Sequence, residues 1–134
     1  MKEDIVSEYK SVGGLRRVGA AFGYSVKGLR AAWAFEHAFR QELLVVAPGM
    51  LLALFLPVAR LEKLALVVVL LLVLVVELLN SAIEAVVDRI SLAHHPLSGR
   101  AKDLGSAAVL LAIAIAALTW GMLLAPLFMG LWAV

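Results

Sequence analysis

Four polar side chains interrupt the apolar middle of this 134-residue sequence at helical spacing: Glu77, Asn80, Glu84 and Asp88. At about 100° per residue they fall on one side of a helix, with Ser81 beside them. An ionisable side chain costs roughly 2.5–3.5 kcal/mol near the centre of a membrane helix, so such residues mark functional sites. We expect this acidic stripe to face a protein interior or the cytoplasmic boundary. Hydrogen bonding between helices is an equally good role for Asn80 and Ser81.

The two glutamates of the stripe predict a site for a hard cation. Glu77 and Glu84 are two helical turns apart, too far to share one ion comfortably. A carboxylate from another helix, such as Glu36 or Glu42, would complete a site for Mg²⁺, which prefers oxygen ligands. The alternative for Glu36 is an ordinary helix-surface pair with Arg40, four residues later.

A third polar cluster, Ser-Gly-Arg-Ala-Lys-Asp, occupies residues 98–103. We expect Ser98 to cap the last membrane helix and leave its first backbone N–H groups free. Helix amino termini attract phosphate, and Arg100 and Lys102 would add positive charge there. Anchoring of the helix end at the cytoplasmic surface is the alternative role of these two side chains.

The composition around these clusters is that of an integral membrane protein. Apolar residues make up 63% of the chain, charged residues only 16%, and the mean hydropathy is +0.99. A water-soluble chain of this length could not bury so much apolar surface. The absence of cysteine excludes disulfides, thiolate metal sites and cysteine nucleophiles. The Lys and Arg residues lie beside membrane segments among acids, which argues against a nucleic-acid partner.

The hydropathy pattern predicts an all-α membrane protein, with a polar to mixed piece at 1–42 followed by three apolar pieces at 43–58, 64–90 and 104–134. Apolar residues recur every three or four positions over 15–41 with Arg and Lys between them, which predicts an amphipathic helix on the membrane surface. Three charge-poor stretches predict transmembrane helices, at 43–58, 64–90 and 104–124.

The basic residues predict the orientation of these helices. Ten Lys and Arg lie in residues 1–42 and the 88–103 loop, which three spans place on one side, and only Arg60 and Lys63 lie on the other. Basic residues accumulate on the cytoplasmic side, so the amino terminus and the 88–103 loop are expected there. This side matters because ATP is cytoplasmic. The sequence has no phosphate-binding glycine loop and no protein-kinase signature, so any phosphoryl transfer would need an unrelated architecture.

Three runs of sequence resemble the bacterial integral-membrane diacylglycerol kinases: GYSVKGLRAAWAFEHAFRQE (23–42), ELLNSAIEAVVDRI (77–90) and HPLSGRAKDLGSAAVLLA (95–112). The resemblance covers residues 15–124 and implies one membrane domain there, with an extension at 1–14 and a tail at 125–134 outside it. It implies a homotrimer of three-helix subunits in the bacterial inner membrane, each with an amino-terminal surface helix. It also implies transfer of the γ-phosphoryl group of MgATP to the primary hydroxyl of diacylglycerol, giving phosphatidic acid for phospholipid recycling.

The same resemblance assigns roles to single residues. It implies that Glu36 and Glu84 hold Mg²⁺ and contact the nucleotide, that Glu77 is the general base, and that Asn80 and Asp88 belong to the active site. The remaining implied contacts are with ATP at Arg17, Ser25, Lys102 and Asp103, and with the lipid at Arg17, Glu42, Glu77 and Ser98.

Other functions stay open at this point. The His-His-Pro segment at 94–96 is similar to the undecaprenol kinases, the sister branch of the same superfamily. Intramembrane acids also occur in small transporter or channel subunits, although an ion path needs acids at several depths. A non-enzymatic assembly protein would consume no ATP. Three membrane helices and one surface helix are too few to shield the acids of the stripe from lipid. We therefore expect the chain to form a closed oligomer that covers them.

Overall fold

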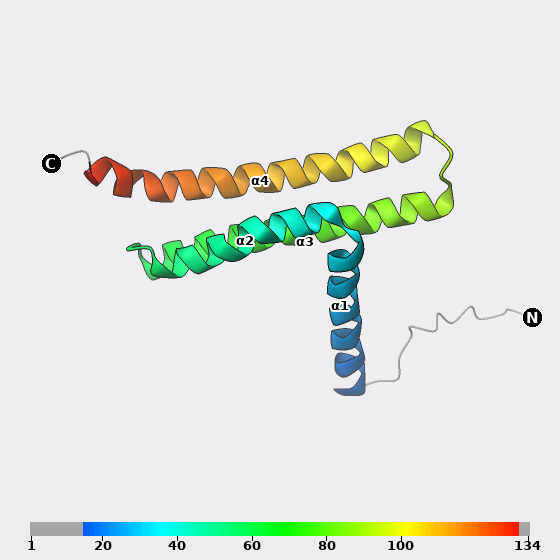
Figure 1. Ribbon diagram of the computed structural model, residues 1–134, viewed down its shortest axis with the longest axis horizontal. Helices are drawn as coiled ribbons and strands as arrows, with labels where there is room; N and C mark the ends of the chain where they lie inside the picture. The colour runs from blue at the N-terminus through cyan, green and yellow to red at the C-terminus, as the bar shows by residue number, and fades with distance from the viewer. Residues whose placement is uncertain (1–14, 132–134) are drawn as a thin grey trace, which may run out of the picture. The chain divides into compact units, whose positions relative to one another are not determined.

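The computed structural model describes residues 15–131, which form four α-helices and fall into two compact units on either side of the Phe35–Glu36 bond (Figure 1). The expected extension at 1–14 and the last three residues of the expected tail lie outside the described residues. The first unit contributes one helix, α1 (Leu15–Phe35), and the second contributes three, α2 (His37–Phe55), α3 (Arg60–Ile90) and α4 (Pro96–Leu131).

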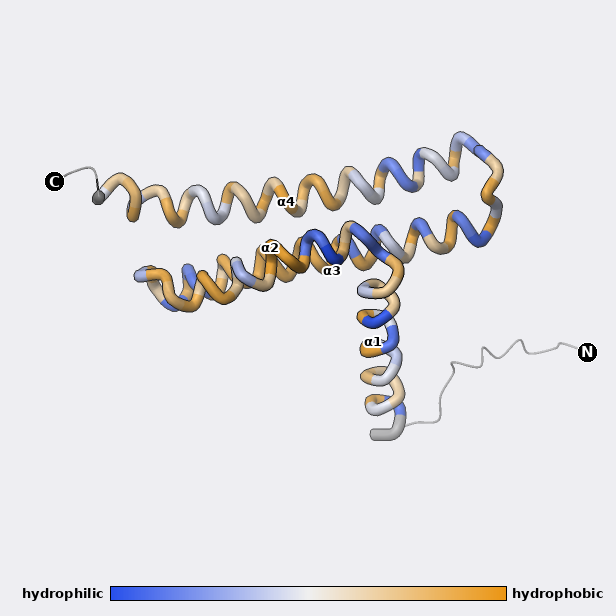
Figure 2. The backbone as a smooth tube through the Cα atoms, viewed as in Figure 1, coloured by the Kyte–Doolittle hydropathy of each residue, from blue (hydrophilic) through white to orange (hydrophobic). Residues whose placement is uncertain are grey.

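Helix α1 is amphipathic along its whole length, as its mixed colours in Figure 2 show. The pattern predicts one helix over 15–41, but the structure ends α1 at Phe35 and starts α2 at His37. Between them Glu36 has an extended backbone, with φ −99° and ψ 111°. The break falls seven residues before the continuous apolar run begins at Leu43, so the first turns of α2 are still polar.

The second unit consists of three helices that are long and apolar enough to cross a membrane. This confirms the predicted fold class, an all-α membrane protein with three candidate spans and an amino-terminal helix. At 1.5 Å per residue, the 31-residue α3 and the 36-residue α4 are about 46 Å and 54 Å long. Both exceed the roughly 30 Å hydrocarbon core of a bilayer, so each extends beyond it.

Helix α4 begins earlier and ends later than the sequence predicts. It starts at Pro96 rather than 104, because proline suits the first helical position and the Leu97 N–H donates to Nδ1 of His95 at 3.2 Å. The predicted cap at Ser98 is therefore wrong, since Ser98 lies within the first turn. The helix also continues past Pro126 to Leu131. As a result, Lys102 and Asp103 are held on a helix rather than in a loop.

Buried residues recur every seven positions and set the register of the three helices. They are Phe39, Val46 and Ala53 on α2, and Leu66, Val73 and Asn80 on α3, where Glu77 is buried in addition. A seven-residue repeat is the seam of helices that cross at a shallow angle. Gly49 of α2 lies against Leu70 of α3, where an added Cβ would be 3.0 Å from Cδ1. Between α3 and α4, the indole N–H of Trp120 donates to the Leu66 carbonyl at 3.2 Å.

The turn between α2 and α3 is held by two polar side chains. The Glu62 carboxylate accepts the Ala59 N–H at 2.7 Å, and the Lys63 ammonium donates to the Leu54 carbonyl at 2.7 Å. Backbone groups at helix ends lack partners within the helix, and these two contacts satisfy one at each side of the turn. Glu62 and Lys63 are thus accounted for by local structure.

Candidate active site

The packing register gathers the acidic side chains of α2 and α3. Gly49 of α2 contacts Leu70 of α3, and the two helices are antiparallel. Glu42 lies seven residues before Gly49 and Glu77 lies seven residues after Leu70, so the two glutamates face each other across the seam. Their carboxylates interact electrostatically. Glu77 is also within electrostatic range of Glu36 and Glu84. The structure therefore brings together the acids that the sequence predicts should share a site.

Glu77 is the most enclosed member of this group, with 3% of its surface exposed. The Ser81 side chain hydrogen-bonds to its carboxylate. Near it, Oε2 of Glu42 and Oδ1 of Asn80 are buried without a hydrogen-bond partner among the described residues. Unsatisfied buried polar atoms are rare because each costs roughly 1–3 kcal/mol, so the Glu42 oxygen points to a position where another molecule supplies the partner, whereas Oδ1 of Asn80 packs against Gly105 of α4.

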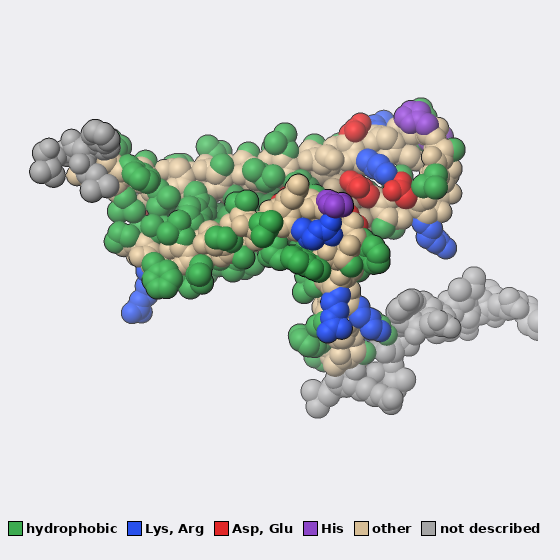
Figure 3. Space-filling model, viewed as in Figure 1, with side chains coloured by type: hydrophobic (Ala, Val, Ile, Leu, Met, Phe, Trp, Pro, Cys, Tyr) green, Lys and Arg blue, Asp and Glu red, His purple; other side chains and the backbone are tan. Residues whose placement is uncertain are grey.

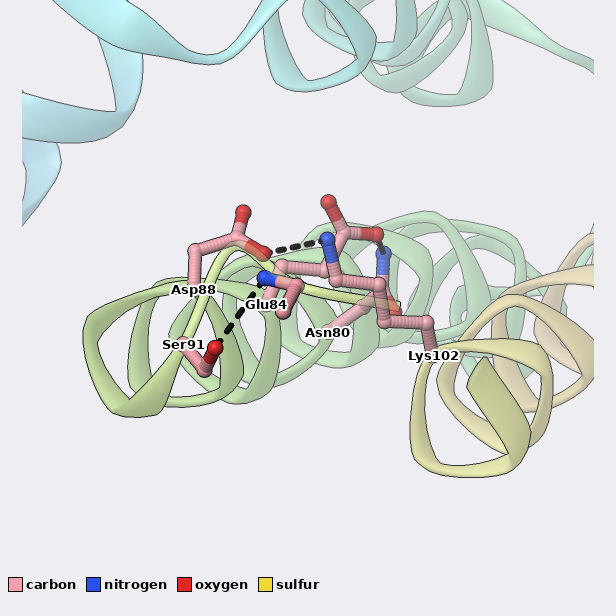
Figure 4. Close-up of polar contacts among 6 residues, drawn as sticks. Asn80, Glu84, Asp88, Ser91 and Lys102 are labelled. Carbon is pink, nitrogen blue, oxygen red and sulfur yellow. Dashed lines mark hydrogen bonds and ion pairs between the residues drawn. The ribbon is translucent and has the colours of Figure 1, made fainter. Parts of the chain in front are cut away.

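The rest of the acidic stripe runs along α3 toward α4 (Figure 4). The Asn80 amide donates from Nδ2 to Oε1 of Glu84 at 3.1 Å. One turn further, Asp88 pairs with Lys102 of α4, with 2.6 Å between Oδ1 and Nζ. Lys102 is also within electrostatic range of Glu84. The stripe thus contains two contacts, Asn80 with Glu84 and Asp88 with Lys102, and Lys102 connects them electrostatically.

The polar residues of the second unit gather at one end. Figure 3 shows acidic and basic side chains around the loop that joins α3 to α4, while apolar side chains cover most of the rest of this face. Arg60, Glu62 and Lys63 lie at the opposite end of α3. Lys63 and Glu84 are 21 residues apart on one helix, or about 32 Å, which matches the hydrocarbon thickness of a bilayer.

The carboxylates of one chain do not form a closed metal site. Within residues 15–131, no group of three or more His, Asp or Glu side chains is placed to hold a metal ion. Glu36 and Glu84 each lie within electrostatic range of Glu77. Mg²⁺ bound by kinases typically takes one or two carboxylates and completes its coordination with phosphate and water, so this donor set suits that ion.

An apolar groove of about 530 Å³ lies among α2, α3 and α4, with Gln41 and Glu42 contributing its polar groups. Its other walls include Val46 and Gly49 of α2, Val73 of α3, and Ala116 and Trp120 of α4. A groove that is apolar along its length and carries a carboxylate has the chemistry to hold a lipid with a small polar head.

The remaining predicted site residues are not on α3 with the acidic stripe but on α4 and α1. Ser98 is half-buried in the first turn of α4, and Asp103 is exposed on the same helix. Arg17 and Ser25 lie on α1, in the first unit, where the Ser25 hydroxyl donates to the Ala21 carbonyl at 3.1 Å.

Sequence reasoning also missed Gly105, which is buried on α4 opposite Asn80. No signal in the sequence singled it out, because its role depends on which residue of α3 lies opposite it.

Comparison with known proteins shows which family this chain is similar to. The family described as "Prokaryotic diacylglycerol kinase" matches residues 23–124. A protein named diacylglycerol kinase from Escherichia coli (strain K12) is 55% identical over 111 residues, covering 83% of this chain and 91% of that protein. One of the same name from Pseudomonas aeruginosa is 48% identical, covering 88% and 96%. Another, from Haemophilus influenzae, is 43% identical, covering 84% and 95%.

Proposed function

The chain belongs to the prokaryotic diacylglycerol kinase family, and from this premise we propose that it transfers the γ-phosphoryl group of MgATP to the primary hydroxyl of diacylglycerol. The product is phosphatidic acid, which re-enters phospholipid synthesis. The observation that carries the proposal is the cluster of Glu36, Glu77 and Glu84, because phosphoryl transfer depends on charge neutralisation and positioning. The kinase domain comprises residues 15–124.

Glu77 is the general base of the proposed reaction. The hydroxyl oxygen of the lipid attacks the γ-phosphorus, the bond from that phosphorus to the β,γ-bridging oxygen breaks, and ADP leaves. The hydroxyl proton passes to the Glu77 carboxylate. Burial keeps water from competing as the nucleophile. Counted from Lys63, Glu77 is about 21 Å along α3, so it lies below the bilayer surface, where a lipid hydroxyl can reach it.

Glu36 and Glu84 would hold Mg²⁺ when MgATP binds. The bound ion would supply charge neutralisation for the phosphoryl transfer. Asn80 orients Glu84 through its amide hydrogen bond. Because two carboxylates are supplied by the chain and the phosphates supply the rest, the site is complete only when ATP is present.

The nucleotide binds where α3 and α4 present their polar ends. Lys102 leaves Asp88 to contact the phosphates, and Asp103 lies near the nucleotide. Arg17 and Ser25 of α1 add further contacts to ATP, and Arg17 also contacts the lipid. Glu42 and Ser98 complete the lipid site. The groove that ends at Glu42 accommodates an acyl chain, which explains its apolar walls.

We place the protein in the bacterial inner membrane, with the amino terminus and the loop between α3 and α4 in the cytoplasm. The excess of Lys and Arg in these segments supports this orientation. Since the chain has no cysteine, single cysteines introduced at positions 61 and 94 can be labelled selectively. A membrane-impermeant thiol reagent added to intact spheroplasts should reach only position 61, and labelling of position 94 alone would reverse the orientation.

The functional unit is a homotrimer in which two chains share each site. Large apolar side chains on α2, such as Leu44 and Phe55, are 72% and 80% exposed, so they need lipid or a neighbouring subunit. A cyclic assembly would also cover the acids and supply the ligands that one chain lacks. We expect inactive Glu36→Gln and Glu84→Gln subunits to recover part of the activity when they are refolded together. Verified mixed trimers that stay inactive would show that each site is built within one chain.

The lipid substrate is tested with purified protein in mixed micelles, labelled ATP and three acceptors: diacylglycerol, monoacylglycerol and undecaprenol. We expect diacylglycerol to be phosphorylated fastest and the reaction to stop when Mg²⁺ is chelated. Faster phosphorylation of undecaprenol would assign the chain to the sister branch instead. ATP consumption that does not depend on any lipid would argue for a transporter, and no consumption for an assembly protein.

A further inference from the structure

Gly105 of α4 lies closer to a neighbouring side chain than any other glycine in the described part of the chain. A Cβ added there would lie 3.3 Å from Cγ of Asn80 and closer still to Oδ1. Of the other seven glycines described, only Gly49 meets a side chain, the flexible end of Leu70, and the remaining six have nothing within 4 Å. The space at position 105 is therefore already taken by the Asn80 carboxamide.

Asn80 is held between two contacts. It is 9% exposed, its Oδ1 faces Gly105 without a hydrogen-bond partner among the described residues, and its Nδ2 donates to Glu84 at 3.1 Å. A side chain at position 105 would push against Oδ1 and turn the carboxamide. Because the other end of that planar group holds the Glu84 carboxylate, the displacement would pass directly to Glu84.

We propose that Gly105 is a positioning residue: by leaving room for the Asn80 carboxamide, it holds the Glu84 carboxylate in the orientation that binds the divalent cation. This inference rests on the proposed function, which gives Glu84 its metal ion. Groups that hydrogen-bond to a metal ligand typically contribute about 10-fold to 100-fold to affinity or activity. Gly105 does not contact Glu84 itself. It acts through Asn80, whose carboxamide occupies the space that a side chain at position 105 would need.

General helix packing does not explain the glycine. Seven and eleven residues further along α4, Ala112 and Ala116 are buried in the same seam, so the α3–α4 contact accepts a Cβ there. Alanine also favours helix more than glycine does. What excludes alanine at position 105 is specifically the side chain at position 80.

The test is a double-mutant cycle with Gly105→Ala, Asn80→Ala and the double variant, made in the full-length protein. Gly121→Ala is the matched control, because it changes a glycine of α4 that has nothing within 4 Å. Mn²⁺ binding in the presence of a non-hydrolysable ATP analogue is measured by electron paramagnetic resonance. Lipid phosphorylation and the thermal stability of the oligomer are measured on the same samples.

We expect Gly105→Ala to weaken Mn²⁺ binding by about 10-fold or more and to lower turnover by about 10-fold to 100-fold. Asn80→Ala alone should also weaken binding. In the Asn80→Ala background the clash is gone, so Gly105→Ala should change Mn²⁺ binding by less than about twofold. Gly121→Ala should bind Mn²⁺ as the unmodified protein does.

Equal losses from Gly105→Ala in both backgrounds, or unchanged Mn²⁺ binding by the single variant, would overturn the inference. If Gly105→Ala does not assemble, assembly of the double variant would still support the steric link to Asn80, and failure of both would refute it. Glu84→Gln measured alongside separates the two proposals. Unchanged Mn²⁺ binding there would remove the metal role of Glu84, whereas weakened binding without coupling between positions 80 and 105 would remove only the role of Gly105.

Discussion

Replacing Glu84 by glutamine is expected to lower lipid phosphorylation by about 100-fold or more, because the metal site loses one of its charged ligands. Glutamine keeps the shape of the side chain and can still accept the hydrogen bond from Asn80. The change therefore removes charge while it preserves packing. The measurement is the initial rate at saturating MgATP and diacylglycerol, together with the oligomeric state in detergent.

Glu62→Gln is the matched control for this prediction. It makes the same substitution on the same helix, at a carboxylate whose contact is with the Ala59 N–H at the opposite end of α3. This control should keep most of its activity. A rate for Glu84→Gln close to that of the control would show that Glu84 is not a metal ligand.

Replacing Glu77 by glutamine is expected to lower turnover by about 10²-fold to 10⁴-fold, the usual contribution of a general base. The KM for MgATP should change much less, since the base acts on the lipid hydroxyl and not on the nucleotide. Steady-state rates over a range of MgATP and diacylglycerol concentrations separate the two parameters. A variant with normal turnover and a raised KM for MgATP would reassign Glu77 to nucleotide binding.

The same variant carries a second, independent expectation about stability. Glu77 is 3% exposed and lies within electrostatic range of Glu36 and Glu84. Removing its charge relieves repulsion in this cluster, so the Glu77→Gln oligomer should be at least as resistant to heat as the unmodified protein. Active sites commonly keep such unfavourable arrangements for the sake of function. Loss of activity with reduced thermal stability would instead indicate a folding defect.

The number and type of helices followed from local properties of the sequence. Charge-poor stretches predicted the three candidate spans, although 43–58 is short for a crossing and the helix found there, α2, runs from His37 to Phe55; the mixed pattern after Leu15 predicted α1. Helix ends were harder to predict. The break at Glu36 has no proline or glycine to signal it, and the start of α4 at Pro96 depends on a hydrogen bond to His95 that hydropathy does not report.

The candidate site was predictable along one helix but not between helices. The 100° rotation per residue placed Glu77, Asn80 and Glu84 on one side of α3 from the sequence alone. Which residues of α2 and α4 face that stripe depends on packing register, and register is set by contacts such as Gly49 with Leu70 and Trp120 with Leu66. Gly105 could not be singled out before its position opposite Asn80 was known.

The short connections within the second unit have a consequence for how the protein folds. Four residues join α2 to α3 and five join α3 to α4, and the main helix contacts are those between neighbours in sequence, α2 with α3 and α3 with α4. Chains with such local contacts fold quickly, because little loop entropy is lost before the contacts form. Each helix can dock on the one before it as synthesis proceeds. In the proposed trimer, association of subunits would then be the slow, concentration-dependent step, so expression level would govern how much folded protein becomes active enzyme.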